Sequence, residues 1–191
     1  MNDMSCSVEH AEPSDAPALY DVMRTTWLDT YPNEALGISV DDIRVRIEGR
    51  NGADIAARVE RWRRTIENPD REVFVAKRGD RVVGYVAPFF DDAERHYRVG
   101  GLYVLPEAQG QGLGHRLIEA SIASIGREHD IYLHVVTYNT RTIDFYRRHG
   151  FVETGRDMTG STAGLEDGRQ IPELEMVLPA AVPRHRAARP E

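Results

Sequence analysis

The sequence is poor in the residues that several common chemistries require. It contains a single cysteine, Cys6, and a single lysine, Lys77. One cysteine cannot close an internal disulfide, and neither a C-x-x-C nor an H-E-x-x-H motif is present, so no metal site is expected. The scarcity of lysine argues against an enzyme that works through a Schiff-base lysine.

Long apolar runs and a surplus of positive charge are also missing. No apolar stretch approaches the roughly 20 residues of a membrane span, and the first ten residues lack the regions of a secretory signal. We therefore expect a cytoplasmic protein with no membrane partner. The formal net charge is −7 at pH 7, whereas nucleic-acid binders concentrate basic residues against phosphates. We expect no nucleic-acid partner, and an acidic surface would attract a small cation.

The 191 residues suffice for one domain with a substantial core. We assign residues 1–178 to this single domain. The segment 179–191 is rich in Pro, Ala and Arg and has no periodicity, so we expect it to be a flexible tail.

Helix and strand patterns alternate along the chain, which predicts a mixed α/β fold. Apolar spacings of three and four residues predict helices at 16–29, 39–49, 51–68, 113–125 and 139–150. Strand patterns lie at 5–12, 96–105, 131–139, 151–157 and 171–178, with a hairpin over 72–90. The segment 131–139 is apolar on nearly every position, which is typical of a central strand covered on both faces.

Three glycines precede a helical pattern in LPEAQGQGLGHRLIEASIASI, residues 105–125. A helix N-terminus carries unpaired N–H groups and partial positive charge, so a glycine-rich turn entering it can surround a phosphate. The P-loop pattern is absent, and the third glycine of a dinucleotide fingerprint counted from Gly110 would fall on His115. A phosphate site for another ligand and a purely structural turn both remain open.

Two motifs together resemble the GCN5-related N-acetyltransferase (GNAT) family. Gln109-Gly110-Gln111-Gly112-Leu113-Gly114 matches the family's acyl-CoA signature Q/R-x-x-G-x-G/A. Downstream, the segment 139–151 is similar to the family pattern N-x-x-x-x-x-F/Y-Y-x-x-x-G-F. The resemblance spans residues 5–178. It implies the GNAT fold, a mixed α/β architecture with about seven strands and four to five helices, whose sheet is splayed between the fourth and fifth strands.

The resemblance implies an acyl-CoA ligand, with acetyl-CoA as the acyl donor. Main-chain groups of the strand before the glycines would pair with the pantetheine arm, and the diphosphate would lie on the amides of the glycine turn. Asn139 would contact the amide portion of the cofactor, with a plain helix cap as the alternative. The implied cofactor-binding residues are Leu102, Tyr103, Val104, Gln109, Gly110, Gln111, Gly112, Leu113, Gly114, His115 and Asn139.

The implied reaction is direct acetyl transfer from a thioester to a primary amine. Tyr146 matches the family's acid, which protonates the departing thiolate, with packing beside Phe145 as the alternative. His134 takes the position of a base found in some relatives, and its ordinary pKa of about 6.5 suits proton removal at neutral pH. A packed, hydrogen-bonded histidine is the alternative for His134, and water or Glu94 remains open as the base.

The segment WLDTYPNEALGIS resembles a loop of bacterial polyamine and small-amine acetyltransferases. Trp27, Asp29 and Tyr31 would frame a pocket for a cation, although the helical spacing of Trp27 also suits a core residue. We expect a small cationic amine such as a polyamine as the acceptor. A protein or peptide N-terminus and a non-catalytic acyl-CoA sensor are the alternatives. A homodimer is left open, since dimers are common in the family.

Overall fold

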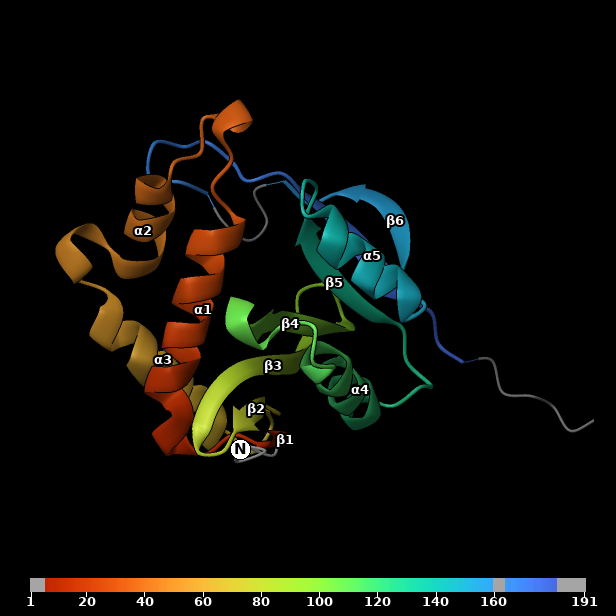
Figure 1. Ribbon diagram of the computed structural model, residues 1–191. Helices are drawn as coiled ribbons and strands as arrows, with labels where there is room; N and C mark the ends of the chain where they lie inside the picture. The colour runs from red at the N-terminus through yellow and green to blue at the C-terminus, as the bar shows by residue number, and fades with distance from the viewer. Residues whose placement is uncertain (1–5, 160–163, 182–191) are drawn as a thin grey trace, which may run out of the picture.

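The computed structural model describes residues 6–159 and 164–181, in which helices and strands follow the predicted order (Figure 1). The helices are α1 (Ala16–Thr30), α2 (Val40–Glu48), α3 (Ile55–Glu67), α4 (Leu113–Ile125) and α5 (Thr140–Arg148). The strands are β1 (Cys6–His10), β2 (Phe74–Arg78), β3 (Arg81–Asp91), β4 (His96–Val104), β5 (Ile131–Val136), β6 (Val152–Asp157) and β7 (Glu173–Leu178).

These strands form one mixed sheet in the order β1-β2-β3-β4-β5-β7-β6. Neighbouring strands are antiparallel except for β4 and β5, which run parallel. The strand β5 lies in the interior of the sheet, as its continuous apolar pattern predicts. The predicted mixed α/β fold is therefore confirmed.

The sheet opens between its fourth and fifth strands. β4 and β5 pair only at Tyr97–Ile131 and Arg98–Tyr132, close to their starts. Beyond these pairs β4 stays beside β3 and β5 stays beside β7. In Figure 1 the ribbons of β4 and β5 accordingly lie at a steep angle to each other. This is the predicted splay, and it leaves a strand edge on each side of a cleft.

A bulge interrupts β4 beside this opening. The register with β3 shifts between Val86 and Pro88, so Gly100 and Gly101 together stand opposite one residue of β3. Gly101 has a φ of +90°, which residues with a side chain rarely adopt. A bulge bends its strand and takes main-chain groups out of the regular ladder. Polar main-chain groups of β4 are therefore available where the cleft begins.

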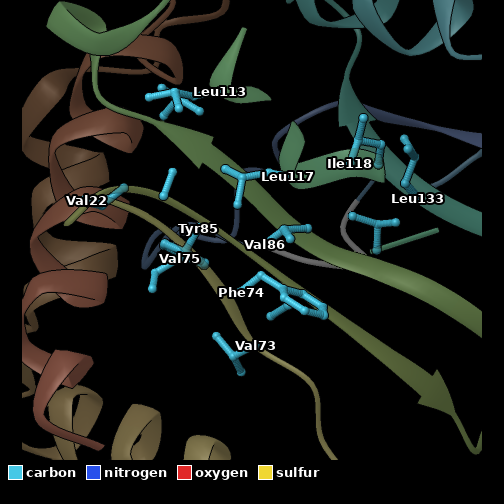
Figure 2. Close-up of a cluster of buried hydrophobic side chains, with 14 of the residues drawn as sticks. Val22, Val73, Phe74, Val75, Tyr85, Val86, Leu113, Leu117, Ile118 and Leu133 are labelled. Carbon is cyan, nitrogen blue, oxygen red and sulfur yellow. The ribbon is translucent and has the colours of Figure 1, made fainter. Parts of the chain in front are cut away.

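Helices cover both faces of the β1–β4 half of the sheet. A Cβ on Gly84 of β3 would lie 3.3 Å from Leu117 of α4, whereas the next residue, Tyr85, meets Trp62 of α3 with ring centroids 4.9 Å apart. Successive strand residues point to opposite faces, so α4 and α3 cover opposite faces. Figure 2 shows part of this core, with Leu117 next to Val86.

Two element ends differ from the predicted ones by three residues or more. The helix expected over 51–68 begins at Ile55, because Asn51 has a left-handed φ of 56° in a 3₁₀ turn that precedes the helix. The strand expected over 131–139 ends at Val136, since Asn139 already caps α5. Both differences arise where a side chain or a turn competes with the regular element.

The first part of the predicted tail is held by the loop between α4 and β5. The N–H of Ala181 donates to the carbonyl of Arg127 at 2.7 Å, and the N–H of Ala180 donates to the Asp130 carboxylate at 2.7 Å. Residues 179–181 are therefore bound rather than free. The remainder of the predicted tail, 182–191, lies outside the described residues.

Two features are absent from the described ranges, a membrane-spanning helix and a cluster of metal ligands. None of the helices within 6–159 and 164–181 combines the length and the apolar character needed to cross a membrane. Within the same residues, no three His, Cys, Asp or Glu side chains lie together in a way that could hold a metal ion.

Candidate functional site

The cleft between β4 and β5 contains two adjoining cavities. The loop cavity, about 560 Å³, lies against the glycine turn, the start of α4 and one face of α5. The tyrosine cavity, about 500 Å³, lies between β4, β5, β7 and α1. The residues that line both cavities are Thr30, Leu102, Val104, Gln109, Asn139 and Thr142. A ligand could therefore extend from one cavity into the other.

The glycine turn presents main-chain donors to the loop cavity. Gly110 and Gly112 have φ values of +76° and +77°, and a Cβ on either would meet no atom of the described residues within 4 Å. The first hydrogen bond of α4 runs from the N–H of Arg116 to the carbonyl of Gly112 at 3.1 Å. The N–H groups of residues 113–115 consequently have no partner within the helix. This end of α4 suits an anion such as a diphosphate.

Two arginines of α5 add positive charge to the same cavity. Arg141, Phe145 and Arg148 all line it. They stand four and three residues apart, so they share one face of the helix. Guanidinium groups are well suited to phosphate oxygens. These arginines were not predicted from the sequence, because only the fold brings α5 next to the glycine turn. Their spacing of seven residues on a predicted helix, which places them on one helix face, was the available signal.

The two glutamines of the signature differ in position. Gln109 lines both cavities, and its side-chain amide donates to the carbonyl of Val104 at 3.0 Å, which ties the turn to the end of β4. Within the residues that the structure describes, Gln111 lines neither cavity. Its side-chain oxygen accepts a hydrogen bond of 2.7 Å from Arg78. Any contact of Gln111 with a ligand would therefore come from its main chain.

The remaining predicted cofactor residues gather around the cleft. Those that line the tyrosine cavity are Leu102, Tyr103, Val104 and Asn139, and those that line the loop cavity include Leu113, Gly114 and His115. The Nδ1 of His115 lies 2.8 Å from the Nε2 of His149. The structure thus brings these residues together along one continuous surface.

Asn139 serves as the N-cap of α5. Its side-chain oxygen accepts the N–H of Thr142 at 3.2 Å. The cap is therefore present, yet Asn139 also lines both cavities. An asparagine that accepts through its oxygen keeps two N–H donors, so the cap does not exclude a contact with a ligand amide.

Tyr146 belongs to α5 and lines the tyrosine cavity, with 5% of its surface exposed. Its ring packs 5.3 Å from Phe145 and 5.5 Å from Phe151, measured between ring centroids. Burial, reinforced by Tyr103, raises the pKa of Tyr146 above its ordinary value. The hydroxyl therefore stays protonated at neutral pH, which is the state that a proton donor needs.

The predicted acceptor residues separate in the structure. Tyr31 lines the tyrosine cavity, whereas Asp29 lines the loop cavity. Within the described residues, Trp27 lines neither of the two cavities. It stacks on Tyr31 with centroids 4.4 Å apart and donates from its indole nitrogen to the Tyr103 hydroxyl at 2.8 Å. Trp27 thus occupies the core position that was its alternative, from which it supports two aromatic residues of the cavity wall.

His134 lines the tyrosine cavity, with 6% of its side chain exposed. Arg98 lies 2.7 Å from the Nδ1 of His134, and because a guanidinium can only donate, Nδ1 must accept. Burial, followed by the charge of Arg98, lowers the pKa of His134 to about 4. The basic nitrogen is engaged and the ring is neutral at pH 7, which weighs against His134 as the base. That role stays a prediction.

The buried His134 is expected to make stability depend on pH. The unfolded side chain binds a proton at about pH 6.5, whereas the folded one resists protonation until about pH 4. The free energy of unfolding should therefore fall by about 3 kcal/mol between these pH values as the solution is acidified. Urea titrations of the wild type and the His134→Asn variant would measure it. The dependence of the free energy of unfolding on pH should become weaker in His134→Asn. It should persist in His129→Asn, whose side chain is 44% exposed. If wild type and His134→Asn showed the same dependence on pH, this expectation would be refuted.

Glu173 is a cavity residue that was not predicted from the sequence. It begins β7, lines the tyrosine cavity and is 3% exposed. It stands opposite Val136 of β5 in the sheet register. A signal was present, because this strand carries two glutamates, Glu173 and Glu175, among four apolar residues, and a buried carboxylate is unusual unless it is paired or functional.

The comparisons with known proteins agree with this geometry. The chain matches the model of the acetyltransferase (GNAT) family over residues 38–151, which is more than half of its length. Its fold is similar to that of yncA from Salmonella typhimurium, solved with its cofactor acetyl-CoA (TM-score 0.68, 20% identity, 96% of this chain and 99% of that one). It is also similar to the PaiA N-acetyltransferase of Thermoplasma acidophilum in complex with coenzyme A (TM-score 0.66, 21% identity, 90% and 98%).

The chain therefore belongs to the acetyltransferase (GNAT) family, and it has the GNAT fold. A further relative is the mycothiol acetyltransferase of Jonesia denitrificans, 35% identical over 97 residues. That match covers 48% of this chain and 30% of the relative, so the chain spans about a third of the length of this curated relative.

Proposed function

We propose that this protein transfers an acetyl group from acetyl-CoA to the nitrogen of a primary amine. The observation that carries the proposal is the continuous cleft in which a glycine turn at one end and Tyr146 at the other line adjoining cavities. Membership of the acetyltransferase family supports it, as does the similarity of the fold to structures that hold acetyl-CoA or coenzyme A.

The loop cavity fits the phosphate end of the donor. The N–H groups at the start of α4 would bind the diphosphate, and the bare backbone of Gly110 and Gly112 would let its oxygens approach. Arg141 and Arg148 would add charge-assisted contacts. The free edge of β4 at residues 102–104 would pair with the pantetheine amides as an added strand. The diphosphate and the pantetheine arm thus each have chemically matched groups.

The chemistry at the other end needs few protein groups. Acetyl-CoA supplies an acetyl group that is already activated as a thioester. Main-chain N–H groups at the bulge of β4, around Gly101, would stabilise the charge that develops on the thioester oxygen. Tyr146 would donate its hydroxyl proton to the departing sulfur. The reaction then requires no covalent bond to the protein.

The acceptor would occupy the tyrosine cavity. The size of this cavity, about 500 Å³, suits a small molecule or the end of a peptide. Its wall includes Tyr31, Tyr103 and the carboxyl of Glu173, and aromatic rings with a carboxylate favour a cation. A small cationic amine such as a polyamine is therefore the acceptor that we propose.

An amine panel tests the proposed function. Purified protein is mixed with acetyl-CoA and with spermidine, putrescine, glucosamine or an alanine-initiated peptide, and free thiol is measured. We expect thiol release that depends on the amine and is fastest with a polyamine. Release with peptides alone would assign the protein to N-terminal acetylation. Tight acetyl-CoA binding without release for any amine would contradict the proposal and indicate a sensor.

A further inference from the structure

The acceptor needs a group in the cavity that removes a proton from its nitrogen. At neutral pH an amine is largely an ammonium ion, which has no lone pair and must lose a proton before it attacks. Among the described residues that line the tyrosine cavity, the titratable groups are Tyr31, Tyr85, Arg98, Tyr103, His134, Tyr146 and Glu173. Arginine stays a cation and His134 already accepts from Arg98. Burial raises the pKa of each of these tyrosines, so they stay protonated.

The bulge of β4 has no room for a carboxylate of its own. A Cβ on Gly100 would lie 2.5 Å from the ring of Phe89 and 3.0 Å from the carbonyl of Ala87. Contacts below 3.0 Å force a neighbour to move. Glu94, which follows β3, forms an ion pair with Arg156 at 3.5 Å and is absent from the described lining residues. A carboxylate that serves this cavity must therefore come from another strand.

The strand β7 supplies this carboxylate, Glu173. Glu173 stands opposite Val136, and residues opposite each other in an antiparallel pair share a face of the sheet. Val136 packs in the cluster that includes Tyr31, Tyr103 and Tyr138. The charge of Glu173 contributes to the raised pKa of each of these three tyrosines. The carboxyl therefore lies among aromatic hydroxyls on the acceptor side of the cleft.

We propose that Glu173 binds the ammonium group of the acceptor and takes the proton that the nitrogen must lose before attack. This inference rests on the proposed function and names the substrate class of its acceptor cavity: a primary ammonium ion held between a carboxylate and the faces or hydroxyls of tyrosines. Glu173 would be the only carboxylate among the described residues of the cavity wall, so no second acid competes for that cation.

The protons and bonds of the step balance. One N–H bond of the ammonium breaks, and its proton forms an O–H bond on Glu173. The freed nitrogen pair bonds to the thioester carbon as the carbon–sulfur bond breaks, and Tyr146 gives its proton to sulfur. The new amide nitrogen loses a second proton, which returns to the Tyr146 oxygen. Glu173 then releases its proton to solvent. The products are an amide, a free thiol and one proton.

The Glu173→Gln variant tests this role with the best amine from the panel. We expect kcat/KM at pH 7.5 to fall at least tenfold, and the decline of kcat/KM towards acid pH that reports Glu173 to disappear. The Kd for acetyl-CoA, measured by calorimetry, should stay within twofold. The Glu173→Asp variant should regain part of the rate that Glu173→Gln loses. It should also regain the decline of kcat/KM towards acid pH, which would not return if Glu173 had only a structural role.

The matched control is Glu175→Gln. Glu175 lies on the same strand, is 1% exposed, is bound by Arg156 and Thr154 and lies 3.7 Å from the Nε2 of His134, but it does not line the cavity within the described residues. Its variant should keep the wild-type pH profile. A Glu173→Gln variant with unchanged kcat/KM, or with reduced activity and the wild-type acid-side decline, would overturn the inference while leaving acetyl transfer in place. If the wild type released thiol with no amine, the proposed function itself would fail.

Discussion

Replacement of Gly112 by alanine is expected to weaken acetyl-CoA binding about 100-fold. Gly112 caps α4 with a φ of +77°, where a side chain costs backbone energy. A methyl group would meet no atom of the described residues, but it would occupy space that the diphosphate oxygens need to reach the N–H groups of α4. Losing one or two charge-assisted hydrogen bonds costs about 3 kcal/mol, or roughly two decades in Kd. Isothermal titration with acetyl-CoA measures the change.

Gly155→Ala is the control for backbone strain. Gly155 lies on β6 with a φ of +81°, and a Cβ there also meets nothing within 4 Å among the described residues. The two variants should lose similar stability in thermal unfolding, while only Gly112→Ala loses affinity. Equal acetyl-CoA affinity in Gly112→Ala and wild type would show that this turn does not hold the diphosphate.

Removal of the Tyr146 hydroxyl is expected to lower kcat by about 100-fold or more, the range typical of a lost general acid. Tyr146→Phe keeps the ring that packs against Phe145 and Phe151, so folding should change little. The sulfur would then leave as an unprotonated thiolate within a buried site. The Kd for acetyl-CoA should stay near the wild-type value, because the loop cavity is untouched. Steady-state kinetics with the best amine, together with calorimetry, separates the two quantities.

Tyr85→Phe is the matched control for this prediction. Tyr85 lies on β3, lines the same cavity and is almost fully buried. Its variant loses a hydroxyl from the cavity wall without removing the proposed acid, so kcat should change only a few-fold. If Tyr146→Phe retained full turnover, the proton for the sulfur would have to come from another group.

The architecture was predictable because it depends on local sequence patterns of apolar residues and glycines. The continuous apolar run at 131–136 indicates a strand that is buried on both faces, and this segment is the interior strand β5. The glycines at 110–114 indicate a turn into a helix, and α4 begins at Leu113. Such features depend on neighbours in sequence, so the sequence alone reveals them.

The parts of the site that escaped prediction depend on contacts between distant segments. Glu173 reaches the cavity because β7 pairs with β5 and places it opposite Val136. The low pKa of His134 arises first from its burial and then from the charge of Arg98 on β4, 36 residues away in the chain. The periodicity of apolar residues along the chain does not show which distant residues become neighbours in the fold. The position of Trp27 was ambiguous for a related reason, since a helical spacing does not say whether a residue faces the core or a cavity.

The most direct test of the account is a crystal structure of the protein with acetyl-CoA. The account predicts that the diphosphate oxygens accept hydrogen bonds from main-chain N–H groups of residues 110–115. It also predicts that the pantetheine runs along residues 102–104 and that the sulfur lies within hydrogen-bond reach of the Tyr146 hydroxyl. A diphosphate bound away from the glycine turn, or a thioester outside the cleft between β4 and β5, would contradict it.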